Sequence, residues 1–363
     1  MQKEIISKKQ ARYILVMFLL GDGIFGLAPE SKQDIWISLL LGYAMYLPVF
    51  LLYLRITSLY PGRGFYDIVM EIFGKVFGRA IVFLYICYAL FLGGTILKIL
   101  VDFIHTASLP ETPQIVFMVF FMLFCTVMTK CGIEPFGRWC QFLFPFFVFT
   151  LVATSIISIN AMDFNYLKPV GGSGLKNIVS GAFSIYSYPF AESVMFLTVL
   201  GSLKKTDKPR KIIFTGTLIA LMTLLVISLR NLFILGPTSF AASYPSYEAV
   251  GTVSLGNFFS RFEILIAINY MTTIFAKTSF CQYAAVTGMG KFFHLKDYKT
   301  MAFPAGFIMI TVGLMFFPSA TSLLNWKKTY SYLAQIFELI LPLIIWLGGE
   351  IRYILKGKAA AVS

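Results

Sequence analysis

Several ionisable side chains of this sequence fall inside apolar stretches, where a charge is costly. Asp22 is flanked by glycines, Glu192 lies in the apolar run at 177–203, and Lys277 lies in the run at 262–287. A charged group in hydrocarbon costs on the order of 2 kcal/mol or more unless it is paired, protonated or hydrated. These residues therefore indicate charge pairing, proton binding or ligand recognition at membrane depth.

Each of these side chains has more than one chemical role open to it. Glu192 either faces a cavity and binds a proton or, protonated, only ties two helices together. Asp22 either neutralises a substrate amine, caps a helix or pairs with a lysine. Lys277 either pairs with one of these acids or extends its amine towards the cytoplasm. Together with Thr278 and Ser279 it places an amine and two hydroxyls at membrane depth.

Two of the apolar runs are interrupted near their centres. The stretch at 21–29 carries three glycines, an acid and a proline, and the stretch at 184–192 carries Pro189 and an acid. Proline lacks the N–H of an unbroken helix and suits the first turn of a restarted one. Gly/Pro-interrupted segments at corresponding positions of two halves indicate a midplane binding site in inverted-repeat transporters. We therefore predict two broken helices that share one site.

Broken helices offer chemistry that an intact span lacks. Their free N–H groups bind anions such as an amino-acid carboxylate, and glycines let a ligand approach the backbone. The alternative for the glycines is close packing between helices. Tyr186 and Tyr188 are expected to wall the pocket. The ligand-binding candidates are Gly21, Asp22, Gly23, Ile24, Phe25, Gly26, Tyr186, Tyr188 and Glu192.

The elements that position these residues follow from composition. With 58% hydrophobic and 13% charged residues among 363, the chain has more long apolar runs than a soluble core of this size uses. We predict an all-α polytopic membrane protein with ten transmembrane helices, in two five-helix repeats at 1–165 and 166–363. The predicted spans are 11–29, 35–56, 80–106, 113–130, 139–160, 177–203, 212–236, 262–287, 301–319 and 330–355.

Shorter features of the sequence also carry predictions. The stretch at 65–77 has helical apolar spacing and is predicted to be an amphipathic helix at the membrane surface. Lys98 and Asp102 are four residues apart and are expected to satisfy each other. Arg230 is expected at the membrane interface. The outer loop at 236–260 either has a functional role, covering a site or contacting a partner, or is a structured connector.

The charge distribution gives an orientation. Of 30 Lys and Arg residues, 21 lie in segments that are cytoplasmic if the N-terminus is, and only 6 lie in the outer segments. Both termini are therefore expected in the cytoplasm. The net charge of +13 is explained by this pattern in a lipid bilayer, so no nucleic-acid partner is expected. Cysteine and histidine spacing indicates no metal site, and no cofactor or enzymatic motif is found.

The ordered motifs of the chain resemble those of the spore-germination permease family, the B subunits of nutrient germinant receptors in the amino acid/polyamine/organocation transporter superfamily. The matching pieces are Ile6–Gln10, the glycine-rich stretch ending at Pro29, Tyr60-Pro61 with Gly74–Gly78, Gly132-Ile133-Glu134 with Arg138 and Pro145, Pro169 with Gly174, Pro189–Glu192, and Tyr244-Pro245 with Arg261.

The resemblance implies a LeuT/APC-like fold of two inverted five-helix repeats with broken helices one and six. It also implies assembly with the receptor's A and C subunits in the inner membrane of the spore. Asp22 departs from the family pattern, which more often has a small or hydroxyl residue there. In sodium-coupled relatives, hydroxyls on span eight help bind sodium, so Lys277, Thr278 and Ser279, with Glu192, are candidates for ion or proton coupling in which the amine replaces the cation.

Three functions remain open from the sequence. The first is a germinant-receptor subunit that binds a small nutrient such as an amino acid at the two breaks. The second is a proton-coupled amino-acid transporter acting alone, with Glu192 as the proton carrier. The third is a scaffold whose cavity is vestigial. The first two share one fold, so the sequence separates them poorly.

Overall fold

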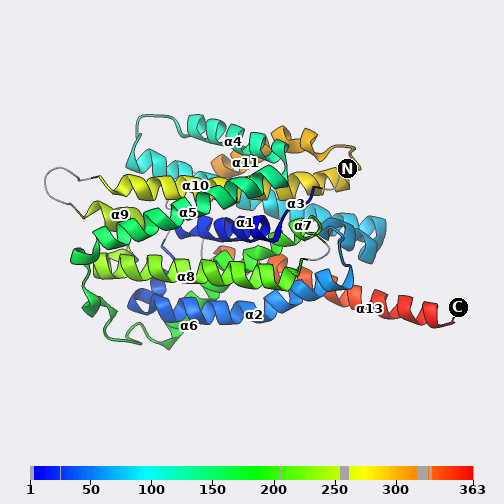
Figure 1. Ribbon diagram of the computed structural model, residues 1–363, viewed down its shortest axis with the longest axis horizontal. Helices are drawn as coiled ribbons and strands as arrows, with labels where there is room; N and C mark the ends of the chain where they lie inside the picture. Colours follow the sequence, from blue (N-terminus) through cyan, green and yellow to red (C-terminus); the bar gives the residue numbers. More distant parts are fainter. Residues whose placement is uncertain are drawn as a thin grey trace.

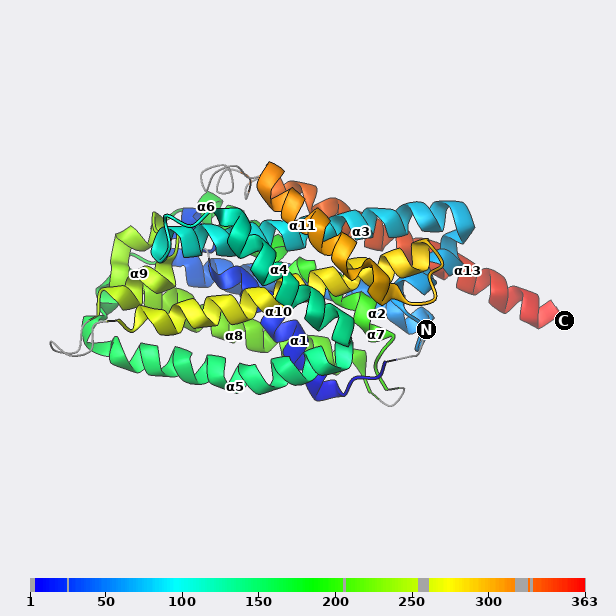
Figure 2. The same ribbon diagram turned by 90° about the horizontal axis from the view of Figure 1, so that it is seen from above.

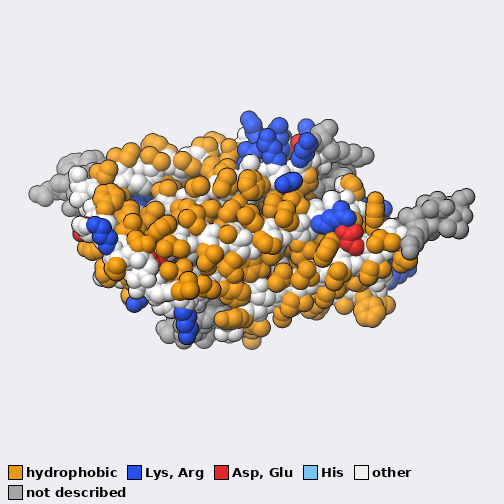
Figure 3. Space-filling model, turned by 90° about the horizontal axis from the view of Figure 1, so that it is seen from below, with side chains coloured by type: hydrophobic (Ala, Val, Ile, Leu, Met, Phe, Trp, Pro, Cys, Tyr) orange, Lys and Arg blue, Asp and Glu red, His pale blue; other side chains and the backbone are white. Residues whose placement is uncertain are grey.

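The computed structural model describes residues 4–24, 26–204, 207–253, 261–316, 326 and 329–362. These residues are almost entirely helical, and most helices run along the long axis of the molecule (Figure 1). Both termini lie at one end, whereas the short helix α9 (Pro245–Gly251) lies at the other. The side chains of the face in Figure 3 are mostly hydrophobic, with a few separate clusters of charge. Such an exterior suits lipid.

Nine helical segments of the described chain are long and apolar enough to cross a membrane. A helix satisfies its own backbone hydrogen bonds, which is the requirement for a segment surrounded by lipid. These segments are Pro29–Leu59, Phe65–Ala107, Gln114–Cys131, Ile133–Ile157, Leu175–Leu200, Pro209–Phe240, Glu263–Phe292, Tyr298–Phe316 and Thr329–Leu355.

Most of the labelled helices lie within these segments, and the last one continues past Leu355. They are α2 (Ile35–Leu59), α3 (Phe65–Ala107), α4 (Gln114–Cys131), α5 (Ile133–Ile157), α6 (Leu175–Ile185), α7 (Leu197–Leu200), α8 (Pro209–Leu235), α10 (Glu263–Phe292), α11 (Ala302–Phe316) and α13 (Leu341–Val362). The prediction of a polytopic helical protein is confirmed. Nine of the ten predicted spans correspond to these segments, whereas the first predicted span does not, so the count of ten and the repeats at 1–165 and 166–363 stay predictions.

The first predicted span is a short helix at the centre of the bundle. Helix α1 (Lys8–Leu20) lies among α5, α8 and α10, and almost all of its side chains are buried (Figures 1 and 2). It begins at a capping box, in which Ser7 N–H donates to Gln10 Oε1 at 2.8 Å and Gln10 N–H donates to Ser7 Oγ at 3.3 Å. It ends after 13 residues, too short to cross a bilayer of about 30 Å.

The end of α1 is a point of very close helix contact. A Cβ at Gly21 would lie 2.9 Å from the Cβ of Lys277 and 3.2 Å from the carbonyl oxygen of Thr273. Only glycine lets the chain approach α10 this closely. A single 3₁₀ turn, η1 (Gly21–Ile24), then follows. The predicted break in the first helix is therefore present, and it rests directly on the helix that carries the buried lysine.

The second predicted break interrupts the helix that starts with α6. The α-helical hydrogen bonds end at Ile185, and a π-helical turn, η5 (Tyr186–Phe190), and a 3₁₀ segment, η6 (Ala191–Phe196), follow before α7. Tyr188 leaves the helical region at φ −128° and ψ 104°, and Ala191 is helical again. Proline at 189 removes one N–H at this point, which matches the predicted restart of the helix.

The segment at 65–77, predicted to be an amphipathic helix, is shorter than predicted. Gly74, at φ +75°, interrupts α3 and turns the chain, so this segment ends there rather than at Phe77, and its position at the membrane surface stays a prediction. A Cβ at Gly78 would lie 2.9 Å from the Cα of Met70, which shows that the short segment folds back on the start of the long one. Phe65 is buried edge-on against Tyr85, with ring centroids 4.9 Å apart.

Candidate functional site

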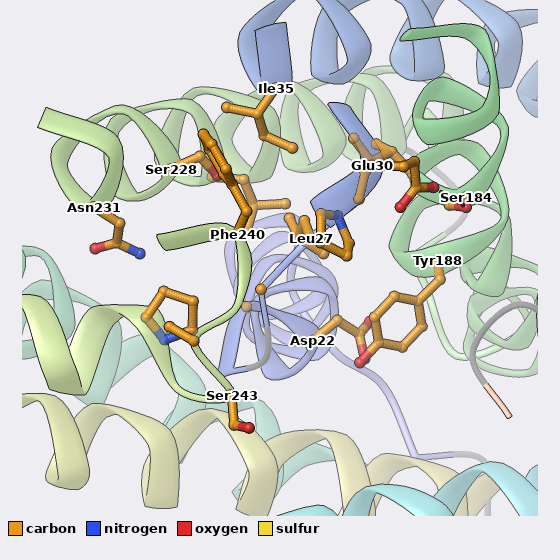
Figure 4. A pocket seen from close by; sticks show the side chains of 18 of the residues that line it. Asp22, Leu27, Glu30, Ile35, Ser184, Tyr188, Ser228, Asn231, Phe240 and Ser243 are labelled. Carbon is orange, nitrogen blue, oxygen red and sulfur yellow. Dashed lines mark hydrogen bonds between the residues drawn. The ribbon is translucent and has the colours of Figure 1, made fainter. Parts of the chain in front are cut away.

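A cavity of about 360 Å³ lies where the two broken helices meet (Figure 4). This volume falls in the range of small-molecule sites, which are mostly apolar with a few placed polar groups. The first break contributes Asp22 and Gly23, and the second contributes Tyr188. Apolar side chains of α2, α3 and α8 also line it, among them Ile35, Leu92, Ile96, Ile99, Leu224, Ile227 and Leu232.

The segment between α8 and α9 also contributes to the cavity wall. Residues 239–243 and Pro245 line the cavity, as do Ser228 and Asn231 near the end of α8. A Cβ at Gly26 would lie 3.2 Å from Pro245 Cγ, so the first break packs directly against this segment. The outer loop at 236–260 therefore covers the site in its described part, which is one of the two alternatives left open by the sequence; residues 254–260 lie outside the described chain.

A three-membered ionic cluster, Asp22–Lys277–Glu192, lies beneath the cavity. The Nζ of Lys277 donates to Asp22 Oδ1 and to Glu192 Oε2, and all three side chains are fully buried. Lys277 Nζ also lies 5.0 Å from the ring centroid of Phe18 and 5.2 Å from that of Tyr188. Of the alternatives for Lys277, pairing with the acids is therefore the one observed, and the lysine joins both.

The local structure explains how two acids meet one lysine. Asp22 lies in the 3₁₀ turn η1 that follows α1, and Glu192 lies in the 3₁₀ segment η6. Lys277 comes from the middle of the continuous helix α10. Breaking such a buried ion pair is costly, because it leaves a charge without its partner. The cluster thus fixes both breaks to one rigid helix, and with all three groups ionised its net charge is −1.

A further carboxyl group lies behind Glu192 and was not among the predicted residues. Glu338 is fully buried in a π-helical turn, η9 (Ile336–Ile340). Its Oε1 accepts from Tyr88 at 3.0 Å, and its Oε2 accepts from Ser187 at 2.7 Å. The signal was available, because an acid inside the run at 330–355 has the same significance as Glu192 in its own run.

Tyrosine hydroxyls connect the two glutamates. Tyr330 donates to Glu192 Oε1 at 2.5 Å, and its oxygen lies 3.0 Å from that of Tyr88, which contacts Glu338. Tyr330 also lines the cavity. Sequence reasoning missed both tyrosines, because single aromatic residues in apolar runs carry no distinguishing pattern.

The predicted ligand-binding residues divide into three groups. Those that line the cavity are Asp22, Gly23, Gly26 and Tyr188. Those that lie outside the lining are Gly21, which packs on α10, Tyr186, whose hydroxyl donates to Gln335 Oε1 at 3.0 Å, and Glu192, which lies in the ionic cluster. Phe25 and the side chain of Ile24 lie outside the described residues.

The candidates for ion coupling on α10 do not all take part in the cluster. Thr278 and Ser279 are buried beside Lys277 but do not line the cavity. Thr278 Oγ1 has no hydrogen-bond partner among the described residues. Only Lys277 of the three joins the two breaks.

Glu30 is a further polar residue that the predictions did not include. It lines the cavity, and its Oε1 accepts from Ser184 at 3.2 Å (Figure 4). Lys32 lines the cavity as well, so the lining carries two acids, Asp22 and Glu30, and one lysine. The two carboxyl groups are suitable partners for the cationic group of a ligand.

Lys98 and Arg230 are two further ionisable residues for which the sequence predicts surroundings. Lys98 donates to Asp102 at 2.5 Å, so their predicted pairing is confirmed. Arg230 is buried within the protein, and its guanidinium donates to Thr154 Oγ1 at 3.0 Å and to Asn231 Oδ1 at 3.1 Å. These polar groups satisfy the guanidinium, and its position at the membrane interface stays a prediction. Asn231 also donates to Ser246 at 2.9 Å, which attaches α9 to α8.

Comparison with known proteins identifies relatives over nearly the whole chain. The family described as "Spore germination protein" matches residues 5–321. Spore germination protein KB of Bacillus subtilis is 25% identical over 361 residues, which cover 96% of this chain and 95% of the relative. Spore germination protein YndE of the same organism is 24% identical and covers 82% of this chain and 83% of its own length.

Solved structures of membrane transporters share the fold. The nucleobase-cation-symport-1 family transporter Mhp1, closed with bromovinylhydantoin bound, superposes with a TM-score of 0.73 and 14% identity, over 95% of this chain and 78% of that one. MhsT in complex with L-phenylalanine superposes with a TM-score of 0.70 and 13% identity, over 95% of this chain and 89% of that one. The LeuT/APC-like fold is thus confirmed, and family and fold are those of permeases and transporters rather than enzymes.

Proposed function

Since the chain belongs to the spore germination protein family, we propose that it is the membrane subunit of a nutrient germinant receptor and binds a small nutrient at the broken helices. The observation that carries this proposal is the cavity of about 360 Å³ at the two breaks, directly above the buried Asp22–Lys277–Glu192 cluster. Residues of both breaks line this cavity, so a ligand bound in it would contact both interrupted helices.

The chemistry of the cavity supports an amino acid as the nutrient. Its walls are mostly apolar, and the charged residues that line it are two acids, Asp22 and Glu30, which suit an ammonium group, and Lys32. The backbone of the first break, near Gly23 and Gly26, is the proposed contact for the carboxylate. MhsT, which shares the fold, was solved with L-phenylalanine, and this supports an amino acid of moderate size.

The mechanism follows from where the ligand would sit. An ammonium group near Asp22 competes with Lys277 for the same carboxylate, and so weakens the tie between the first break and α10. Because Lys277 is also paired with Glu192, a change in its contact with Asp22 also changes its contact with the second break. Closure of the segment at 239–245 over the ligand then changes the outer surface that partners contact.

The partners and location proposed for this chain come from the family. Germinant-receptor A and C subunits would assemble with it in the inner membrane of the spore, with both termini in the cytoplasm. The charge distribution of the sequence supports this orientation. Its nine apolar membrane-crossing segments among the described residues support a multi-pass arrangement.

A germination screen against single amino acids and sugars tests the proposal, in a strain whose only receptor contains this chain. The steric variant Ser228→Trp fills the cavity from α8, and Val226→Trp, on the exposed face of the same helix, is its control. We expect Ser228→Trp to lose the response to the active nutrient by tenfold or more in dose, with the same amount of protein in the membrane. An unchanged dose response would contradict binding in this cavity.

A proton-coupled amino-acid transporter acting alone is the second candidate. The buried Glu192–Lys277 pair favours it, because titratable groups at membrane depth are typical of proton-coupled transport. Uptake of labelled amino acid by this chain alone in vesicles would support transport. A requirement for co-expressed A and C subunits would support the receptor.

A further inference from the structure

The two glutamates and two tyrosines form a chain of three hydrogen-bonded contacts across the bundle. In order, these are Glu338 Oε1 to Tyr88 at 3.0 Å, Tyr88 to Tyr330 at 3.0 Å, and Tyr330 to Glu192 Oε1 at 2.5 Å. Each hydroxyl carries one hydrogen, and an ionised carboxylate carries none. With both glutamates ionised, two hydrogens must therefore serve three contacts, and one contact between oxygens has no hydrogen.

One additional proton satisfies every contact in the chain. With the proton on Glu338, its O–H donates to Tyr88, Tyr88 donates to Tyr330, and Tyr330 donates to Glu192. With the proton on Glu192, all three hydrogen bonds run in the opposite direction. The chain is equally complete in both arrangements, because the tyrosine hydroxyls both donate and accept.

The charges around the chain decide which arrangement is favoured. Lys277 contacts Glu192 directly, and its ammonium stabilises an anion at that end. Glu338 has no ion-pair partner among the described residues; its other oxygen accepts from Ser187 at 2.7 Å and from Gln335 at 3.4 Å. A buried carboxyl with no cation beside it favours the neutral form.

From this geometry we propose that Glu338 is a proton-binding site and that Tyr88 and Tyr330 form a relay joining it to Glu192. In the transfer step, the proton of Glu338 passes to Tyr88, the hydrogen of Tyr88 passes to Tyr330, and that of Tyr330 passes to Glu192. One proton leaves one carboxyl group and one arrives at the other, so both tyrosines end neutral and no other reactant is needed.

The relay connects the cavity through hydrogen bonds to the carboxyl group of Glu338, which lies outside the cavity lining. Tyr330 lines the cavity, whereas Tyr88, Glu192 and Glu338 do not. The position of Lys277 sets where the proton lies. A lysine that is released from Asp22 and stays on Glu192 keeps the proton on Glu338, whereas a lysine that leaves Glu192 deprives that anion of its partner, and the proton then moves there. The other ionisable or charged groups facing these residues are Asp22, Lys277, Tyr46, Tyr53, Tyr85, Tyr186, Tyr188 and Cys281.

Infrared spectroscopy of the purified chain in lipid nanodiscs tests the proton site without any nutrient, so its failure is separate from that of the proposed function. At neutral pH we expect a carboxylic-acid C=O stretching band that shifts in D₂O. This band should be lost in Glu338→Gln and retained in Glu111→Gln, whose carboxyl is exposed. Absence of the band from the unmodified protein, or its retention in Glu338→Gln, would overturn the assignment.

Glu338→Gln is well suited to this test because it preserves the hydrogen bonds. The amide N–H₂ of glutamine donates to Tyr88 as the protonated acid does, and the chain to Glu192 stays complete. Normal membrane insertion and a monodisperse chromatographic profile are therefore expected for this variant. Should it fail to fold, the band of the milder Ser187→Ala variant must change in frequency, since the hydroxyl of Ser187 contacts Glu338 directly. An unshifted band would overturn the site.

A double-mutant cycle on the same band tests the relay. Glu192→Gln should shift the Glu338 band, because the tyrosines transmit the change in hydrogen-bond polarity. In a Tyr330→Phe background the same substitution should shift the band by less than half as much. An equal shift in both backgrounds would mean that the two glutamates interact only through space, and the relay would be wrong.

Discussion

Glu192 and Glu338 are two fully buried glutamates in interrupted helices, and they differ in what surrounds them. Glu192 contacts the ammonium of Lys277, whereas the hydrogen-bond partners of the Glu338 side chain in the described part of the chain are hydroxyl and amide groups. The first environment holds a carboxylate, and the second holds a neutral acid. The comparison teaches that acids in apolar runs have different roles. The groups that contact the carboxyl decide whether it is a negative charge or a protonated, neutral acid.

The local backbone differs as well. Glu192 lies in a 3₁₀ segment after the Tyr188 break, and Glu338 lies in a π-helical turn. π-turns inside helices occur often at functional sites because they widen the helix and expose backbone groups. Here the carbonyl of Glu338 accepts from Tyr53 at 2.5 Å, and the same hydroxyl contacts the carbonyl of Ala191 at 3.0 Å. The two irregular segments are therefore linked to each other.

The largest expected effect comes from removing the shared cation. Lys277→Met leaves Asp22 and Glu192 buried without a counter-ion, which typically costs about 3–5 kcal/mol. We expect a loss of unfolding free energy of this order in SDS titration of the purified protein, or loss of the protein from the membrane. A matched control is Lys299→Met, because Lys299 is half-exposed and its contact to Glu4 is 3.8 Å; it should change stability by less than about 0.5 kcal/mol. Equal effects of the two variants would contradict the role given to Lys277.

The two glutamates should respond differently to the same substitution. Glu192→Gln removes the anion from a site that faces an ammonium, and is expected to cost about 2–3 kcal/mol, as for a hydrogen bond to a charged group. Glu338→Gln keeps the hydrogen bonds of a neutral acid and should cost less than about 1 kcal/mol. The measurement is the midpoint of SDS-induced unfolding for both variants. If Glu338→Gln were the more damaging, the contrast between the two environments would be wrong.

A smaller effect is expected from the link between the two irregular segments. Tyr53→Phe removes the hydroxyl that contacts the backbone carbonyls of Glu338 and Ala191, and we expect a cost of about 1 kcal/mol. Thermal unfolding followed by intrinsic fluorescence provides the measurement. Tyr332→Phe is the control, because Tyr332 is 71% exposed. A cost no greater than that of the control would show that the two segments do not depend on this link.

The smallest expected effect concerns a residue that lies beside the site without lining it. Tyr186→Phe removes one hydroxyl contact, to Gln335 at 3.0 Å, and should cost about 0.5 kcal/mol. The dose of nutrient that triggers germination should stay within twofold of the unmodified receptor. A tenfold shift in this dose would mean that Tyr186 contacts the ligand and belongs to the binding site.

Much of this fold could be predicted from the sequence because hydrophobic length is an unambiguous signal. The predicted run at 35–56 became α2, and that at 113–130 became α4 with a shift of one residue at each end. The breaks at Gly21 and Tyr188 were also predictable, since glycine, proline and an acid are each unfavourable inside a span. What the pattern could not give is the length of α1, which is set by contact with α10.

The site was predicted less completely than the fold. Asp22, Glu192 and Lys277 stood out because a charge in an apolar run is costly, but the sequence could not say that one lysine contacts both acids. That arrangement depends on the distance between three helices far apart in the chain. Tyr330 was not predictable at all, because its role comes only from the two groups that its hydroxyl meets.

The volume of the cavity has a consequence for the energetics of activation. At roughly 30 Å³ per molecule in the liquid, a space of about 360 Å³ holds on the order of ten waters when no ligand is present. A nutrient that fills it must release a similar number to the surroundings. Binding is therefore linked to water activity, and solutes too large to enter the cavity should increase the apparent affinity for the nutrient as their osmotic pressure rises.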